Sequence, residues 1–234
     1  MLIWSKSKFT AELIGTFGII FFGCGALMVL ERFPGALSPP LIPIIFGLAV
    51  ATMIYSLGHI SGAHFNPAVT LGFALSRHFR LKELPSYWIA QFLGAILALA
   101  LLYYLLPSGI LYGATIPNTN SLAALAWECI LSFFLMFVIS AVATDTRAVG
   151  IMAGAAIGAI VTLAAYIGGP VTGAAINPAR ALAPALFQGS LGSIWIYFAG
   201  PFLGCALGAL TYEKIRCKLP TPADTPDKKP GGCC

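Results

Sequence analysis

The sequence predicts an all-α membrane protein with six transmembrane helices and two re-entrant half-helices that form an inverted repeat. Three observations lead to this fold class. The chain is 59% hydrophobic and only 9% charged, with a mean hydropathy of +0.89. Six apolar runs approach the length of about 20 residues that a spanning helix needs. An Asn-Pro-Ala motif occurs twice, each time between apolar runs.

The composition excludes several classes of protein. A soluble domain carries about 25% charged residues, whereas this chain of 234 residues has only 13 Lys and Arg and 8 Asp and Glu. An ordinary soluble enzyme, a nucleic-acid-binding protein and a disordered protein are therefore not expected. A transmembrane β-barrel would show alternating segments of about 10 residues. The long unbroken apolar runs do not fit that pattern.

The positions of the basic residues predict how the spans are oriented. The six predicted spans are residues 9–30, 40–58, 86–106, 121–143, 149–167 and 193–213. Lys and Arg near span ends favour the cytoplasmic side. With both termini cytoplasmic, that side receives Lys6, Lys8, Arg77, Arg80, Lys82, Arg147, Lys214, Arg216, Lys218, Lys228 and Lys229. Arg32 falls opposite, and Arg180 lies in one of the two connecting segments described next. We therefore expect a multi-pass protein of the plasma or inner membrane with both termini inside.

Two connecting segments, residues 59–85 and 168–192, are too apolar to be plain loops. Each contains a stretch of about 10 apolar residues, near 66–76 and 177–187, which fits a re-entrant half-helix rather than a span. The two segments also align without gaps. Each copy contains three spans and one half-helix, and only the spans cross the membrane. Three is an odd number of crossings, so the second copy is inverted with respect to the first. Residues 1–213 then form one domain, with repeat one over about 9–106 and repeat two over about 121–213.

The Asn-Pro-Ala motifs predict where the half-helices begin. Asn is a good N-cap, and Pro is preferred at the first helical position. Inverted half-helices enter from opposite faces, so their N-termini meet in mid-membrane, where each carries roughly half a positive charge. That point would repel cations, including protons. Amide donors at the centre and backbone carbonyls of 59–65 and 170–176 on either side would orient a single file of water, which is the design of a channel.

The motif sequences around residues 61–70 and 172–180 resemble those of the aquaporin (major intrinsic protein) family. The resemblance covers about residues 9–213, and the stretch from Gly58 to Leu71 looks closest to the nodulin-26-like branch and its bacterial relatives. It implies a homotetramer with one pore per subunit and passive flux without a cofactor. The pore motifs it carries over are Asn66, Pro67, Ala68, Asn177, Pro178 and Ala179.

The resemblance also implies a four-residue selectivity filter, formed here by Phe46, Ala165, Ala174 and Arg180. Water-selective members have a His where this chain has Ala165. The smaller side chain would widen the constriction and remove a polar group. Arg180 would disfavour cations as a fixed positive charge. We therefore expect water and small neutral solutes such as glycerol, hydrogen peroxide, urea, ammonia or neutral metalloid hydroxides. Ala181 and the pair Tyr197-Phe198 look more like the residues of a water channel, and they favour the alternative of a strictly water-selective channel.

Three further polar residues are candidates for a supporting role. Glu12 and Glu128 lie within spans, where a carboxylate is costly and invites a functional hypothesis. Their related places in the two repeats favour hydrogen bonding to the broken loop backbone over a proton relay. His64 in the first loop is expected to orient loop carbonyls, with gating or pH sensing as the other hypothesis. Glycines spaced four apart, such as Gly154 and Gly158, predict close helix contact.

The predicted function is thus a passive channel for water and small neutral solutes, and not an enzyme. The alternatives are a strictly water-selective channel, a proton-coupled transporter and a closed structural protein. Water, small uncharged solutes, membrane lipid and further copies of the chain are the expected partners, without nucleic acid. No metal site or cofactor is expected. Residues 214–234 are predicted to be a disordered cytoplasmic tail, with Cys217, Cys233 and Cys234 expected to be unmodified thiols or, alternatively, lipidated.

Overall fold

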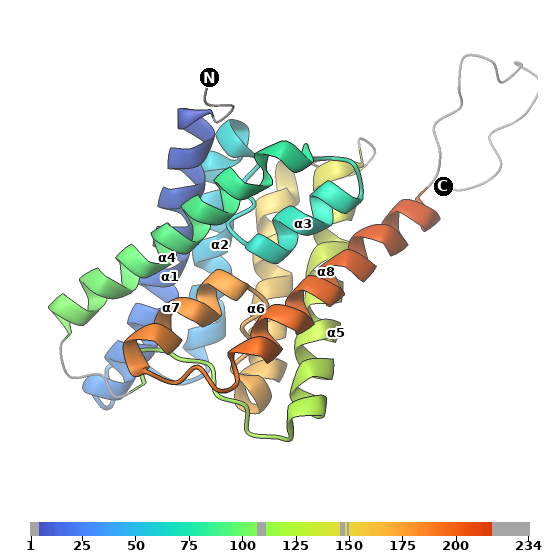
Figure 1. Cartoon of the computed structure of the whole chain (residues 1–234). Helices are drawn as coiled ribbons and strands as arrows, with labels where there is room; N and C mark the ends of the chain where they lie inside the picture. The colour runs from blue at the N-terminus through green and yellow to red at the C-terminus, as the bar shows by residue number, and fades with distance from the viewer. Residues whose placement is uncertain (1–4, 107–110, 146–147, 149, 217–234) are drawn as a thin grey trace, which may run out of the picture.

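The computed structural model describes residues 5–106, 111–145, 148 and 150–216. It confirms the predicted fold class of six long apolar helices and two half-helices, with no strand in these ranges. Figure 1 shows the two short helices between the long ones, α3 toward the upper and α7 toward the lower side of the view. The helices are α1 (Lys6–Arg32), α2 (Leu41–Ser61), α3 (Pro67–Leu75), α4 (Leu84–Leu105), α5 (Ser121–Thr144), α6 (Ala153–Thr172), α7 (Pro178–Gln188) and α8 (Ile194–Ile215).

The helices before the two loops are longer than predicted. Helices α2 and α6 continue to Ser61 and Thr172, past the expected ends at 58 and 167. Each ends at a glycine in the left-handed region, Gly62 with φ 89° and Gly173 with φ 83°, a conformation that favours glycine. The expected non-helical stretches 59–65 and 170–176 are therefore wrong at their starts. Only residues 62–66 and 173–177 lie outside the helices before the half-helices begin.

Helices α2 and α6 cross at the centre of the inverted repeat through a pair of glycines. A Cβ added to Gly158 would lie 2.6 Å from the carbonyl oxygen of Gly47, and one added to Gly47 would lie 2.4 Å from that of Gly158. Such distances leave no room for a side chain. In a membrane, close backbone approach through small residues is a main source of helix association. The predicted role of Gly158 in close helix contact is thereby confirmed.

We expect that replacing Gly158 with Ala lowers the stability of the protein. The added methyl group would press on the Gly47 backbone, and overpacking of this kind costs about 1–3 kcal/mol. Thermal unfolding in detergent, followed by tryptophan fluorescence, measures the effect. Gly169→Ala on the same helix is the matched control, because nothing lies within 4 Å of a Cβ there. Equal melting temperatures for the two variants would contradict the tight crossing.

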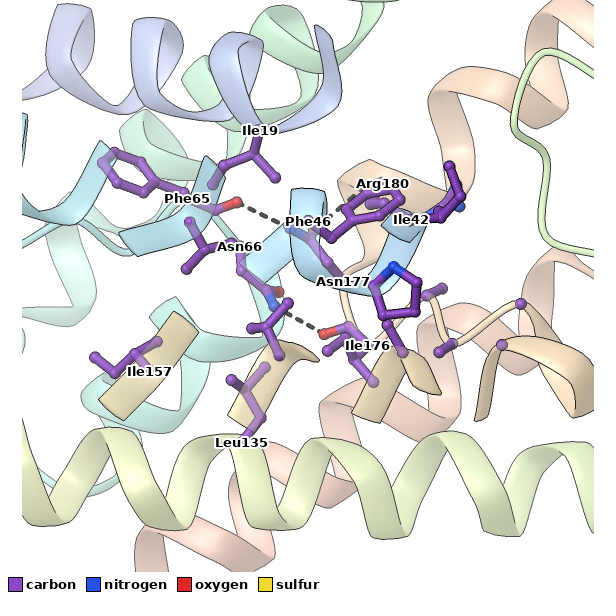
Figure 2. Close-up of a pocket in the computed structure, with 18 of the residues that line it drawn as sticks. Ile19, Ile42, Phe46, Phe65, Asn66, Leu135, Ile157, Ile176, Asn177 and Arg180 are labelled. Carbon is purple, nitrogen blue, oxygen red and sulfur yellow. Dashed lines mark hydrogen bonds between the residues drawn. The ribbon is translucent and has the colours of Figure 1, made fainter. Parts of the chain in front are cut away.

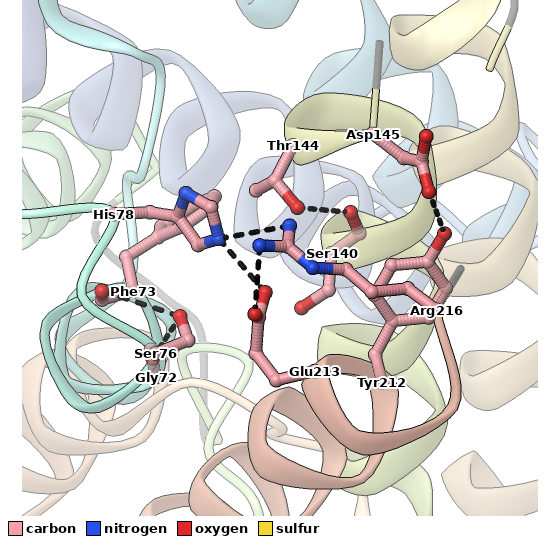
Figure 3. A network of polar contacts seen from close by, with 10 residues as sticks. All are labelled: Gly72, Phe73, Ser76, His78, Ser140, Thr144, Asp145, Tyr212, Glu213 and Arg216. Atoms are coloured by element: carbon pink, nitrogen blue, oxygen red, sulfur yellow. Dashed lines mark hydrogen bonds and ion pairs between the residues drawn. The ribbon is translucent and has the colours of Figure 1, made fainter. Parts of the chain in front are cut away.

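Polar contacts tie three segments together at the end of the molecule where α8 finishes (Figure 3). His78, which follows α3, lies 2.8 Å through Nε2 from Glu213 Oε1 on α8, and Arg216 Nη2 lies 3.0 Å from Glu213 Oε2. Beside this group, the Tyr212 hydroxyl donates to Asp145 Oδ2 at 3.0 Å. The contacts join the end of half-helix α3 to the last turn of α8. The predicted tail, residues 214–234, starts too early, because α8 continues to Ile215. Arg147 and the part of the tail from Cys217 onward, with Cys233 and Cys234, lie outside the described residues.

Candidate functional site

The two half-helices begin at the asparagines that the motifs indicate. Asn66 caps α3 by accepting through Oδ1 from the backbone N–H of Ala68 at 2.9 Å. Asn177 caps α7 in the same way, accepting from Ala179 at 2.9 Å. Pro67 and Pro178 occupy the first helical position, where a missing N–H leaves no bond unmade. With Ala68 and Ala179 they lie buried in the first turns, so the motif shapes the backbone around the asparagines.

Each asparagine also reaches across to the loop of the other repeat. Asn66 Nδ2 donates to the carbonyl oxygen of Ile176 at 2.8 Å, and Asn177 Nδ2 donates to that of Phe65 at 3.0 Å (Figure 2). These two bonds hold the N-termini of α3 and α7 against each other. An amide nitrogen carries two hydrogens, so each asparagine keeps one donor beyond the crossed bond. The partial positive charges of both helix ends add at this point.

The loops before the half-helices adopt a strained backbone. Ala63 and Phe65 have φ of 53° and 49°, and Ala174 and Ile176 have φ of 43° and 45°. Residues other than glycine are uncommon in this region, at a cost of the order of 1–3 kcal/mol each. The alternation is the same in both repeats. Contacts from outside the loops therefore have to hold this conformation.

Two buried carboxylates supply these contacts. Glu12 Oε1 accepts from the Ser61 hydroxyl at 2.7 Å and from the His64 N–H at 3.0 Å, while Oε2 accepts from the Phe65 N–H at 2.7 Å. Glu128 repeats the arrangement in the second half of the chain. It accepts from the Thr172 hydroxyl at 2.7 Å and from the N–H groups of Ala175 and Ile176 at 3.0 and 2.8 Å. Both carboxylates are 0% exposed, so protein donors take the place of water.

Several residues hold the loops in a role that the sequence did not predict. The hydroxyls of Tyr87 and Tyr197 donate at 2.6 Å to the carbonyls of Ser61 and Thr172, the last residues of α2 and α6. Gln91 Nε2 donates both to Glu12 Oε2 at 2.8 Å and to the Thr70 hydroxyl at 2.9 Å. One signal was available: the aromatic pairs Tyr87-Trp88 and Tyr197-Phe198 stand at similar places in the two repeats.

We expect Glu128→Gln to weaken the second loop. Either orientation of the new amide would turn an NH₂ group toward a backbone N–H that the carboxylate now accepts from. Each lost bond to a buried charged group is worth about 1.5–3 kcal/mol, so the melting temperature and the water permeability should both fall. Glu83→Gln is the control, because Glu83 makes an ion pair with the partly exposed Lys8, and ion pairs near the surface are worth about 0–1 kcal/mol. An unchanged melting temperature and water permeability in the Glu128→Gln variant would contradict the role of Glu128 in holding the second loop.

A cavity of about 740 Å³ passes the meeting point of the half-helices. Its lining includes Asn66 and Asn177, and extends from Leu111 and Ala114 on one side to Ala143 and Ala153 on the other. Most of the lining side chains are aliphatic or aromatic (Figure 2). A largely apolar wall with a few fixed donors would let water pass without binding it tightly at many places.

The structure brings together the four residues that the resemblance assigns to a filter. Phe46, Ala165, Ala174 and Arg180 all line the cavity. Arg180 is 5% exposed, donates from Nη1 to the Gly113 carbonyl oxygen at 2.7 Å, and holds its guanidinium 5.2 Å from the centre of the Phe46 ring. The Gly113 contact was not foreseen, because nothing in the sequence links this connecting segment to α7.

The other predicted residues divide between the cavity and its surroundings. His64 is part of the lining, with Nδ1 3.2 Å from the Thr70 hydroxyl and its ring against Phe73 and Tyr87. Its backbone N–H donates to Glu12, which is not part of the lining.

Residues 3–212 match the family described as Major intrinsic protein. The chain belongs to this family.

Named relatives of this major intrinsic protein agree with the predicted branch. It is 48% identical over 210 residues to Nodulin-26 from Glycine max, covering 89% of this chain and 78% of that protein. It is 47% identical over 216 residues to Aquaporin NIP1-1 from Oryza sativa subsp. japonica, covering 89% and 74%. A solved aquaglyceroporin from Plasmodium falciparum superposes with a TM-score of 0.82 at 27% identity, covering 89% and 96%. The predicted nodulin-26-like resemblance is confirmed, and the protein is a membrane channel for water and small neutral solutes, not an enzyme.

Proposed function

We propose that this channel passes, besides water, small neutral solutes that have a hydroxyl edge and a carbon edge. Glycerol is the test case, and hydrogen peroxide, urea, ammonia and neutral metalloid hydroxides belong to the same class. One observation supports this most directly: Ala165 and Ala174 line the cavity together with Arg180 and Phe46. The small side chains of these two alanines leave the cavity wider on their side. The guanidinium offers donors to hydroxyls, and the aromatic ring offers an apolar wall.

Exclusion of protons and ions is the second part of the proposal. Arg180 is a fixed positive charge in the cavity wall, and the N-termini of α3 and α7 add their partial charges at Asn66 and Asn177. The free amide hydrogens of the two asparagines donate to a passing water oxygen. The oxygen of that water is then occupied by the two amide donors, so its own hydrogens point away from the asparagines, toward the two ends of the pore. A continuous proton wire is broken at this point.

A proton-coupled transporter would need Glu12 or Glu128 to exchange protons with the pathway. The contacts of both carboxylates favour the supporting role instead. Three side-chain or backbone groups of the neighbouring loop donate to each of them, and both are 0% exposed. Neither belongs to the lining of the cavity as described. Flux through the channel should accordingly be independent of a proton gradient.

The assembly and orientation are part of the same proposal. We infer a homotetramer with one pore per subunit, in a plasma or inner membrane, with both termini cytoplasmic. The basic residues near the span ends support the orientation. Large apolar side chains on the outer faces of the long helices, such as Leu48 and Leu163 at 60% exposure, are suited to contact lipid or a neighbouring subunit.

Stopped-flow light scattering on purified protein in liposomes tests the proposed function. A sucrose gradient should cause fast shrinkage, and a glycerol gradient should cause fast shrinkage followed by fast reswelling, relative to empty liposomes. Shrinkage without reswelling would mean a strictly water-selective channel, as Ala181 and Tyr197-Phe198 suggest. No acceleration in either gradient would refute an open channel. A dependence on an imposed pH gradient would favour the coupled transporter.

A further inference from the structure

The segment between α3 and α4, residues 76–83, is fastened at both ends across one face of the molecule. Near its start, His78 lies 2.8 Å from Glu213 on α8 (Figure 3). At its end, Glu83 Oε2 lies 2.8 Å from Lys8 Nζ on α1. We call residues 76–83 the strap. The side chains between these two contacts lie on one short segment that joins α3 to α4.

The strap exposes three basic side chains that have no acidic partner among the described residues. Arg77, Arg80 and Lys82 are all exposed, and no ion pair or hydrogen bond joins their side chains to the part of the chain that the structure describes. The acidic groups nearby are already engaged: Glu83 pairs with Lys8, and Glu213 pairs with His78 and Arg216. The strap therefore has an excess of positive charge that an external anion could neutralise.

Apolar side chains continue from the strap along the outside of α4. Leu81, between Arg80 and Lys82, is 66% exposed. Exposed apolar residues then recur at every fourth position of α4, so that each adjoins the next in a stripe that winds gradually around the helix. They are Ile89, Leu93, Leu97, Leu101 and Leu105, each 39% to 53% exposed. An ionic site at the end of a spanning helix thus adjoins an apolar face that runs the length of that helix.

We propose that the strap binds the headgroup of an anionic phospholipid, whose acyl chain lies along the exposed face of α4. The three unpaired cations match a negatively charged headgroup, and Leu81 with the α4 face matches the hydrocarbon chain. Basic residues at a membrane surface attract anionic lipids, and the attraction adds up over neighbouring charges. A soluble phosphate compound would satisfy the charges but leave the apolar face without a partner.

Native mass spectrometry of the purified full-length protein in detergent tests this proposal. Phosphatidylglycerol and phosphatidylcholine with identical acyl chains are titrated separately, and bound lipids per subunit are counted. The wild type should bind the anionic lipid more tightly. The variant Arg77→Gln/Arg80→Gln/Lys82→Gln should lose affinity for it on the order of a hundredfold. The matched control, Lys6→Gln/Arg32→Gln/Lys214→Gln, removes the same charge at exposed sites outside the strap and should bind like the wild type.

Several outcomes would overturn the proposal. Retained phosphatidylglycerol binding in the strap variant, or an equal loss in the control variant, would mean that the strap is not the site. Displacement of the lipid by glycerol 3-phosphate at equal concentration would mean a soluble-phosphate site. Water permeability of the strap variant in liposomes shows whether it is folded. If it did not fold, Leu81→Asn alone provides the test, and unchanged lipid binding in that variant would equally contradict the proposal.

Discussion

Replacing Arg180 with valine is expected to open the channel to permeants that the wild type excludes. The guanidinium is a charged group in the lining of the cavity, where it donates to the Gly113 carbonyl oxygen and lies 5.2 Å from the centre of the Phe46 ring. A unit charge about 4 Å from a passing cation costs that cation about 4 kcal/mol at an effective dielectric constant of 20. Removing it should raise cation and proton leakage by up to about a thousandfold. Solutes larger than glycerol should also enter, because the side chain becomes smaller.

The leak is measured in liposomes that contain a pH-sensitive dye, under an imposed potassium diffusion potential. Arg32→Val is the control, because Arg32 is exposed at the end of α1 and is not part of the cavity lining. The increase should remain partial, since the N-termini of α3 and α7 still oppose cations at the asparagines. If neither leakage nor solute selectivity changed, the assignment of Arg180 to the filter would be wrong.

Replacing Ala165 with histidine is expected to separate glycerol flux from water flux. Ala165 lines the cavity on α6, in the group that includes Phe46 and Arg180. An imidazole there would take up width and add a polar group that water can use. Pore width and the donors along it decide which neutral solutes pass. Glycerol permeability should fall about tenfold or more, while water permeability should stay within about a factor of two.

Stopped-flow reswelling in glycerol and shrinkage in sucrose measure the two permeabilities on the same liposomes. Ala165→Ser is the matched control, because it adds polarity with little volume and should leave glycerol flux high. Equal suppression of glycerol and water by Ala165→His would contradict the argument from size. Suppression by Ala165→Ser as strongly as by Ala165→His would mean that polarity, rather than width, limits glycerol.

The sequence predicted most of the fold because the signals involved are local. Apolar length decides which segments span, and Asn66 and Asn177 cap the half-helices through bonds to residues two positions away. The ends of α2 and α6 were predicted several residues too early. Gly58-His59 and Gly169-Pro170 resemble helix breakers, yet both helices continue through them to the left-handed turns at Gly62 and Gly173. A proline near a helix end is tolerated when packing holds that turn in place.

The site was predicted unevenly. Phe46, Ala165, Ala174 and Arg180 were assigned by resemblance, and their lining of one cavity supports an assignment that stays a prediction until the variants are measured. The contacts that hold the site were less visible. Tyr87, Tyr197 and Gln91 are ordinary residues within apolar spans, and their importance arises from the atoms that they reach.

The number of spans and the starts of both half-helices follow from the sequence alone, because each depends on neighbouring residues. The inverted repeat also follows from it, because the two similar segments can be compared without knowing the fold. The bonds between distant segments, by contrast, became known only from the folded chain. Asn66 and Asn177 donate to carbonyls 110 and 112 positions away, Glu128 accepts from loop groups 44 to 48 positions away, and Arg180 donates across 67 positions. Local patterns cannot specify these partners, since an unpaired polar group in hydrocarbon takes whichever partner the packing of the spans brings within reach.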